Sequence, residues 1–158
     1  MINNIYRVVL FGHRNFSGHR ILDERLRPLL IGLINANPFL EIYIGRNGEF
    51  DIYAATLVKS VLNVTGKENT EFICVLPYPE KNMEYYEDYY DSVIIPEHLG
   101  KSHPKGAITR RNRWMVEQAD LFVCYLEQES GGVYTALKYA KKLKKQIINL
   151  AKEEHAKY

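Results

Sequence analysis

The stretch that decides the fold is residues 119–150, which read ADLFVCYLEQESGGVYTALKYAKKLKKQIINL. It begins with a short apolar run, residues 121–126, whose composition is typical of a strand buried on both faces. The pair Gly131-Gly132 follows, and apolar residues then recur at helical spacing over residues 133–143. A second apolar run, residues 147–150, ends the stretch. Strand, glycine turn, helix and strand together predict a βαβ unit with parallel strands and a right-handed crossover.

The rest of the chain alternates in the same way. Further strands are predicted at residues 6–11, 40–44, 72–76 and 92–95, and further helices at 21–35, 51–66 and 107–118. Pro28 is expected to kink the first helix or to mark its start, because it lacks a backbone donor. The pattern predicts a single α/β domain over residues 1–158, a three-layer sandwich with a mostly parallel sheet. Residues 78–104 are expected to form a lid or insertion.

Composition sets limits on location and chemistry. The chain has 158 residues, a formal net charge of +2 and 46% hydrophobic residues. It has no apolar stretch near the ~20 residues of a membrane span and no signal-peptide pattern, so a cytoplasmic protein is expected. Cys74 and Cys124 lie in apolar runs and are expected to be buried free thiols. No spacing of His, Cys and Asp suits a metal, and no cofactor is expected.

Candidate ligand-binding residues follow the predicted strands. The carboxyl ends of parallel strands meet at one edge of a sheet, where ligands bind, and helix N-termini there suit an anion. The candidates are Gly12, His13 and Arg14 after the first strand, Gly45, Arg46, Asn47, Gly48 and Asp51 after the second, Tyr78 after the third, Arg111 in the arginine-rich helix, and Gly131, Gly132, Tyr134 and Thr135 at the last glycine turn.

Several of these candidates also have a purely structural interpretation. The turn at Gly131 and Gly132 could cradle a phosphate, or it could be a tight turn in which Thr135 satisfies first-turn N–H groups. Arg111 could hold a phosphate bidentately, or it could be one of three solvated arginines on an exposed helix face. Asp51 could cap its helix or accept a hydrogen bond from a ribose hydroxyl. A lone histidine such as His13 is more often structural than catalytic.

Tyrosines gather in the predicted lid. They are Tyr78, Tyr85, Tyr86, Tyr89 and Tyr90. Their rings could stack on a base, which stabilises binding by roughly 1–3 kcal/mol per base, or they could pack the lid onto the body or onto a dimer partner. The acidic residues between them would repel a polyanion, which favours a small ligand over nucleic acid.

Three motifs together carry a resemblance to a known family. They are the turn at residues 45–48 with Asp51 at the helix start, the run RRNRWM at residues 110–115, and the run SGGVYT at residues 130–135. In this order they resemble the SLOG superfamily, a Rossmann-like group that includes DNA-processing Smf/DprA proteins and the lonely-guy enzymes. The closest resemblance is to small bacterial proteins of the YpsA kind. It implies binding of a nucleotide or a nucleotide-derived small molecule across the carboxyl ends of the strands. Some members cleave an N-glycosidic bond to a ribose phosphate, and others only sense a ligand.

The chain also departs from this pattern. Lonely-guy enzymes carry Pro-Gly-Gly-x-Gly-Thr-x-x-Glu, whereas here Tyr134 replaces a glycine and Lys138 stands at the position of the catalytic Glu. Arg111 and Met115 match the arginine-helix pattern, with Asn112 in place of Lys. The resemblance therefore implies that phosphate binding is better preserved than bond cleavage. An ammonium at Lys138 would attract a phosphate and oppose a cationic transition state, or Lys138 could simply face solvent beside Lys141 and Lys142.

Three functions follow, in order of expectation. The first is a non-catalytic protein that binds or senses a nucleotide-derived small molecule. The second is a nucleoside or nucleotide N-glycosidase or ribosyl transferase, with a carboxylate drawn from Glu49, Asp51, Glu127 or Glu129, although no catalytic residue is assigned. The third is a DNA-binding module that uses the basic helix, which the small net charge and the acidic lid disfavour. The expected partners are a small molecule and a second copy in a homodimer or larger assembly, with nucleic acid unlikely and no membrane.

Overall fold

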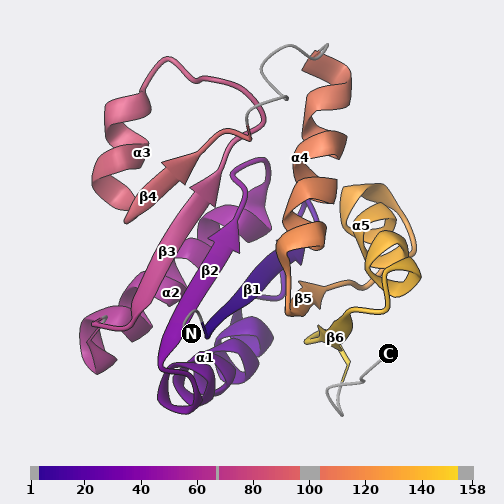
Figure 1. Ribbon diagram of the computed structural model, residues 1–158. Helices are drawn as coiled ribbons and strands as arrows, with labels where there is room; N and C mark the ends of the chain where they lie inside the picture. The colour runs from indigo at the N-terminus through magenta and orange to yellow at the C-terminus, as the bar shows by residue number, and fades with distance from the viewer. Residues whose placement is uncertain (1–3, 67, 97–103, 153–158) are drawn as a thin grey trace.

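The computed structural model describes residues 4–66, 68–96 and 104–152. Its centre is a six-stranded sheet in the order β4-β3-β2-β1-β5-β6, in which every recorded pairing is parallel (Figure 1). The strands are β1 Ile5–Gly12, β2 Phe39–Ile44, β3 Thr70–Val75, β4 Ser92–Ile94, β5 Leu121–Tyr125 and β6 Gln146–Asn149. The helices are α1 His19–Ala36, α2 Glu49–Thr65, α3 Met83–Tyr89, α4 Pro104–Gln118 and α5 Gly131–Lys142. The predicted Rossmann-like α/β sandwich is confirmed, and its sheet is wholly parallel in these strands.

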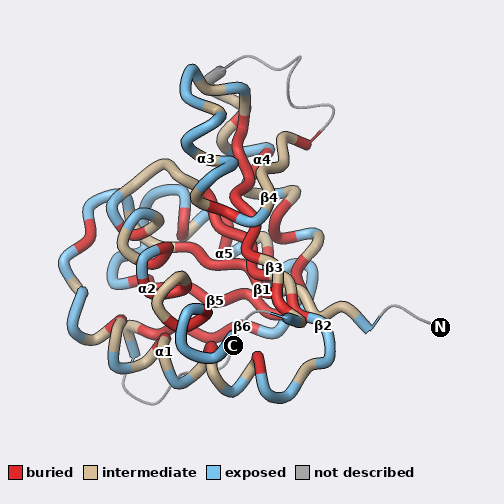
Figure 2. Tube along the Cα trace, turned by 90° about the vertical axis from the view of Figure 1, so that its left-hand side faces the viewer, coloured by how far each residue is buried: buried red, intermediate tan, exposed pale blue. Residues whose placement is uncertain are grey.

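The sheet is covered on both faces, so its strands form the buried middle layer (Figure 2). Alternating residues of the central strand β1 point to opposite sides. Val8 and Leu10 pack in one core with α1 and α2, whereas Val9 and Phe11 pack in a second core with α4 and α5. This two-sided burial explains why the strands read as nearly continuous apolar runs.

Helix α1 runs without interruption through Pro28, so the expectation that Pro28 marks its start is wrong. Pro28 is exposed, and the buried residues Leu22, Leu26, Leu30 and Ile34 on the opposite face hold the helix against the sheet. Burial of that stripe outweighs the one backbone hydrogen bond that proline removes.

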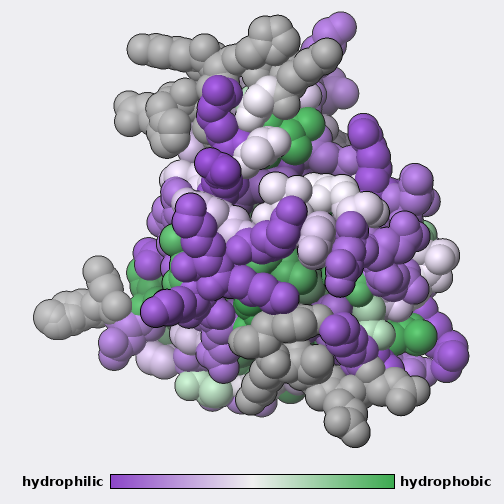
Figure 3. Space-filling model, turned by 90° about the vertical axis from the view of Figure 1, so that its right-hand side faces the viewer, coloured by the Kyte–Doolittle hydropathy of each residue, from purple (hydrophilic) through white to green (hydrophobic). Residues whose placement is uncertain are grey.

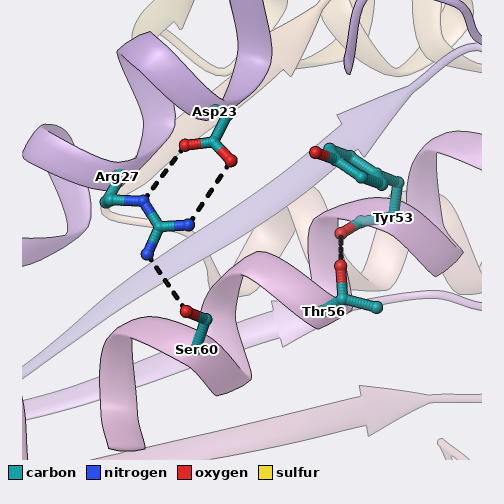
Figure 4. Close-up of polar contacts among 5 residues, drawn as sticks. All are labelled: Asp23, Arg27, Tyr53, Thr56 and Ser60. Atoms are coloured by element: carbon teal, nitrogen blue, oxygen red, sulfur yellow. Dashed lines mark hydrogen bonds and ion pairs between the residues drawn. The ribbon is translucent and has the colours of Figure 1, made fainter. Parts of the chain in front are cut away.

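A polar contact joins helix α1 to helix α2, which pack on the same face of the sheet. Arg27 forms two hydrogen bonds to the carboxylate of Asp23, at 3.1 and 3.4 Å, and donates a third to Ser60 Oγ at 3.1 Å (Figure 4). Arg27 therefore links α1 directly to α2.

The strand order creates a switch point between β1 and β5. The chain moves from β1 outward through β2, β3 and β4, then crosses to the other side of β1 to form β5 and β6. Gly12 at the end of β1 lies opposite Tyr125 at the end of β5, and Leu10 lies opposite Ile44 at the end of β2. The loops that leave these three strands therefore share one edge, where a doubly wound sheet opens a crevice.

The predicted lid or insertion is partly described. It contains α3 and β4, and β4 extends the sheet by pairing with β3 through Ile73 and Ser92. Residues 97–103 of this segment lie outside the described residues. Both cysteines are buried and free, as expected. In the described parts of the chain, no helix has the length and apolar character needed to cross a membrane.

Candidate functional site

A cavity of about 310 Å³ opens at the carboxyl edge of the sheet, at the switch point. Its walls come from the end of β1, the turn after β2, the middle of α4 and the start of α5. Ten of the fourteen predicted ligand-binding residues line it: Gly12, His13, Arg14, Gly45, Asn47, Gly48, Asp51, Arg111, Gly131 and Gly132. The four that do not are Arg46, Tyr78, Tyr134 and Thr135. Most of the residues predicted from the sequence therefore lie around one cavity.

The glycines after β1 and β2 are required by the packing of the protein itself. A Cβ atom at Gly12 would lie 2.0 Å from the ring of Phe50, and one at Gly48 would lie 2.7 Å from the Cα atom of Arg14. A Cβ atom at Gly45 would approach the Arg111 guanidinium to 3.0 Å. These positions explain why the turns are glycine-rich without reference to a ligand.

The glycine pair at the start of α5 is different. Gly131 has φ +81°, which favours glycine, but a Cβ atom there would meet nothing within 4 Å. A Cβ atom at Gly132 would meet only Asn112 Nδ2, at an ordinary 3.6 Å. The N-cap residue Ser130 makes no side-chain capping bond, and the first turn carries no acidic residue. The electropositive end of α5 therefore borders the cavity with open space around its glycines.

Arg111 is buried, with only 2% of its surface exposed, so the interpretation as a solvated arginine is wrong. Its Nη1 donates to the Val75 carbonyl at 2.7 Å, its Nη2 to Asn47 Oδ1 at 2.6 Å and its Nε to Asn112 Oδ1 at 2.8 Å. Burial lowers the pKa of Arg111, and the nearby Asp51 carboxylate acts in the opposite direction. The side chain ties α4 to the ends of β2 and β3 and brings a positive charge to the cavity wall.

Asp51 lies in the first turn of α2 and accepts a hydrogen bond from the Asn47 backbone N–H at 3.0 Å. The N-cap itself is Gly48, so Asp51 stabilises the preceding turn from within the helix. Burial raises the pKa of Asp51, while the Asn47 N–H and the charges of Arg111 and Arg46 act to lower it. Among the described carboxylates, Asp51 is the one that lines the cavity.

His13 joins the loops after β1 and β5. Its Nε2 accepts hydrogen bonds from the backbone N–H groups of Glu127 and Gln128, at 3.0 and 3.3 Å. An accepting Nε2 carries no proton, which places the ring proton on Nδ1 in this hydrogen-bond assignment. His13 therefore lines the cavity itself while it links the loop after β1 to the loop after β5.

Arg46 points away from the cavity into the tyrosines of α3. Its Nη1 donates to the Tyr90 hydroxyl at 2.8 Å, and its guanidinium carbon lies 5.3 to 6.0 Å from the ring centroids of Tyr85, Tyr86, Tyr89 and Tyr90. The rings also contact one another. In this arrangement the tyrosines pack α3 onto the turn after β2, which is the packing alternative of the two considered.

The remaining candidates lie beside the cavity. Thr135 is exposed, and its hydroxyl donates to the Gly131 carbonyl at 3.3 Å. Tyr134 and Tyr78 are half-buried outside the lining. Lys138 is exposed, with its Nζ 4.6 Å from the centroid of the Tyr134 ring, and it does not line the cavity. Lys138 therefore takes the solvent-facing alternative of the two considered, because the helix turns that position outward.

Asn112 is a cavity residue that the sequence did not single out as a ligand contact. It lines the cavity, and because its Oδ1 is bonded to Arg111, its amide nitrogen faces Gly132. The available signal was its place beside Arg111 in the motif, where the resembled enzymes have a lysine.

Two solved structures share this fold. DNA processing protein A (DprA) from Streptococcus pneumoniae superposes with a TM-score of 0.65 at 16% identity, over 90% of this chain and 49% of the DprA chain. DprA from Helicobacter pylori gives a TM-score of 0.60 at 18% identity, over 90% of this chain and 63% of that one. The chain thus spans about half of the first protein and under two thirds of the second. At these identities the likeness shows the fold alone, which is the Rossmann-like fold that these DprA proteins share. No family model and no curated protein matches the chain.

The expectation that nucleic acid is an unlikely partner is corrected by this comparison. The H. pylori protein, which has the same fold, binds single-stranded DNA. The expectation rested on a net charge of +2 and on the acidic residues around α3, but a net charge averages over the surface. Lysines gather locally along α5 and in the residues that follow it: Lys138, Lys141, Lys142, Lys144 and Lys145. Figure 3 shows that the described surface on this side is largely hydrophilic.

Proposed function

We propose that this protein binds a nucleotide or a nucleotide-derived small molecule in the cavity at the β1–β5 switch point, with a phosphate at the start of α5. The observation that carries the proposal is the open glycine pair at an uncapped helix N-terminus, directly beside a buried arginine. Helix N-termini and guanidinium groups are the usual protein partners of phosphate. A cavity near 310 Å³ is at the lower end of the range for small-molecule sites.

The charges of the cavity walls support one orientation of this ligand. The α5 side is positive, since it combines the helix dipole with Arg111, while the α2 side carries the carboxylate of Asp51 in its first turn. A ligand with an anionic end at α5 and a hydrogen-bond donor at Asp51 fits both walls. A nucleotide has this form, with its phosphate at one end and its sugar hydroxyls or base amine at the other.

The proposal extends to the domain organisation, the family likeness and the role expected from the sequence. We take residues 1–158 as one domain of this kind, akin in its motifs to the small YpsA-like proteins, and as a binding or sensing protein. Catalysis of N-glycosidic cleavage is the alternative, and in this cavity it would depend on Asp51. Incubation with nucleoside monophosphates and chromatography for free base tests it. Sustained base release that Asp51→Asn abolishes would make the protein an enzyme.

The binding proposal is tested by calorimetry with a panel of nucleoside monophosphates, the matching nucleosides and inorganic phosphate. The decisive variant is Gly132→Ala, because the new methyl group has room in the protein yet stands where the phosphate would lie. The control is Gly32→Ala in α1, where a new Cβ atom would meet nothing within 4 Å. We expect Gly132→Ala to weaken nucleotide binding by at least about tenfold, the equivalent of one lost hydrogen bond to a charged group, and Gly32→Ala to leave it unchanged. Equal affinities in the two variants, or no binding to the wild type, would refute the proposal.

Single-stranded DNA is the second candidate ligand. The fold neighbour that binds single-stranded DNA and the lysines on and after α5 support it. Fluorescence anisotropy with a labelled oligothymidylate at several salt concentrations tests this candidate, since phosphate contacts make affinity fall with salt. Competition by a nucleoside monophosphate would indicate that the strand uses the same cavity.

A further inference from the structure

We propose that the groove between α4 and α5 is a second anion subsite, so that the preferred ligand carries two phosphate groups in succession, as in a dinucleotide. This inference rests on the proposed function. The groove has a volume of about 220 Å³ and is lined by Thr109, Asn112, Arg113, Gly132, Thr135 and Ala136. None of these side chains is acidic.

The groove continues directly from the main cavity. Asn112 and Gly132 line both the cavity and the groove. Because Gly132 has no side chain, the passage from the cavity to the groove is open. A phosphate bound at the start of α5 therefore has its next linked group above Gly132, at the mouth of the groove.

Asn112 presents a hydrogen-bond donor at this junction. Its Oδ1 accepts from Arg111 Nε at 2.8 Å, which fixes the orientation of the amide. The Nδ2 group is then the atom nearest to Gly132, at 3.6 Å from the position of a Cβ atom. Because the buried Arg111 holds Asn112, this donor is preorganised toward the passage.

The far wall of the groove carries a positive charge with a defined orientation. The Arg113 guanidinium carbon lies 5.2 Å from the centroid of the Tyr139 ring, and Tyr139 is itself held by a 2.6 Å hydrogen bond from its hydroxyl to Glu117. Stacking uses the face of a guanidinium and leaves its N–H edge for an anion. Among the described residues, the recorded ion pairs do not include Arg113.

Two hydroxyl groups complete the groove, one on each helix. Thr109 and Thr135 are both exposed, and the bond of Thr135 to the Gly131 carbonyl is long at 3.3 Å, so the hydroxyl can rotate toward a ligand. An amide, a guanidinium and two hydroxyls without a carboxylate suit a phosphodiester, whose oxygens only accept hydrogen bonds.

The experiment compares thymidine 5′-monophosphate with the 5′-phosphorylated thymidine dinucleotide by calorimetry on the full chain. We expect the dinucleotide to bind the wild type at least about tenfold more tightly, as one added charge-assisted contact allows. Arg113→Ala and Thr135→Val should reduce this preference and leave monophosphate affinity unchanged. The control is Arg110→Ala, an exposed arginine of α4 outside both linings, which should preserve the preference.

The outcomes separate the two proposals. Equal affinity of the wild type for the two ligands would overturn the second subsite and leave the proposed function standing. A preference that Arg113→Ala and Arg110→Ala reduce alike would reflect general charge and would also overturn it. Failure of the wild type to bind either ligand would refute the proposed function and this inference together.

Discussion

At the scale of single residues, the two adjacent glycines of α5 have different requirements. Gly131 needs its left-handed backbone, whereas Gly132 has no positive φ and ample room. We expect Gly131→Ala to lower the free energy of unfolding by about 1–2 kcal/mol and Gly132→Ala to change it by less than about 0.5. Thermal melts of both variants, run without ligand, check this. A larger loss for Gly132→Ala would mean that its role is structural.

Arg111 shows how a buried charge couples a binding wall to folding. Its removal would leave the Val75 carbonyl and the Asn47 and Asn112 amides without their donor. We expect Arg111→Ala to lower the free energy of unfolding by about 3 kcal/mol, and Arg111→Lys to be nearly as costly because lysine lacks the guanidinium fork. Denaturant unfolding measures both, with the exposed Arg110→Ala as control. A loss below about 0.5 kcal/mol would show that Arg111 serves ligand binding alone.

At the scale of elements, α3 is held to the body by two cationic side chains, Arg46 in the turn after β2 and Lys59 of α2, whose Nζ donates to the Tyr89 carbonyl at 2.7 Å. The helix has no fully buried residue of its own, and Arg46 supplies hydrogen bonds to the hydroxyls of Tyr85 and Tyr90 together with contacts to four rings. We expect Arg46→Ala to speed hydrogen exchange of the Met83–Tyr89 amides by about tenfold, the equivalent of ~1.4 kcal/mol, while α5 amides stay unchanged. An Arg20→Ala control, at an exposed site on α1, should change neither. Unchanged exchange in α3 would mean that the ring contacts and Lys59 hold the helix without Arg46.

At the scale of the whole molecule, buried tyrosines make the fold sensitive to alkali. Burial, reinforced by Glu41, raises the pKa of Tyr43 to about 12, and burial also raises the pKa of Tyr90. Because the folded state holds these protons more tightly than the unfolded state, their contribution is intact below about pH 10 and is lost as the pH rises toward about 12. We expect Tyr43→Phe to remove about 1.4 kcal/mol of the stability loss between about pH 9 and about pH 11. Urea unfolding at about pH 9 and about pH 11 measures this loss of stability. Equal losses in the variant and the wild type would show that Tyr43 does not cause it.

The sequence by itself determined the strands, the helices other than α3 and the edge of the sheet at which the loops meet. Apolar runs and helical spacing predicted every strand, and the glycine turns at residues 45–48 and 131–132 predicted a shared crevice. These predictions succeed because alternating strands and helices of this length have few ways to bury their apolar faces, and a parallel sheet brings all its carboxyl ends to one side.

Only the tertiary structure decided where the long polar side chains go. Arg111 and Arg113 stand two residues apart on α4, yet one is buried beneath the cavity and the other faces the groove beside α5. Arg46 leaves the cavity for the tyrosines of α3, and Lys138 turns outward. An arginine or lysine reaches several ångströms through flexible bonds, so its partner depends on which distant strands and helices become its neighbours. Local sequence spacing specifies a helix face, and the assembled sheet determines what that face meets.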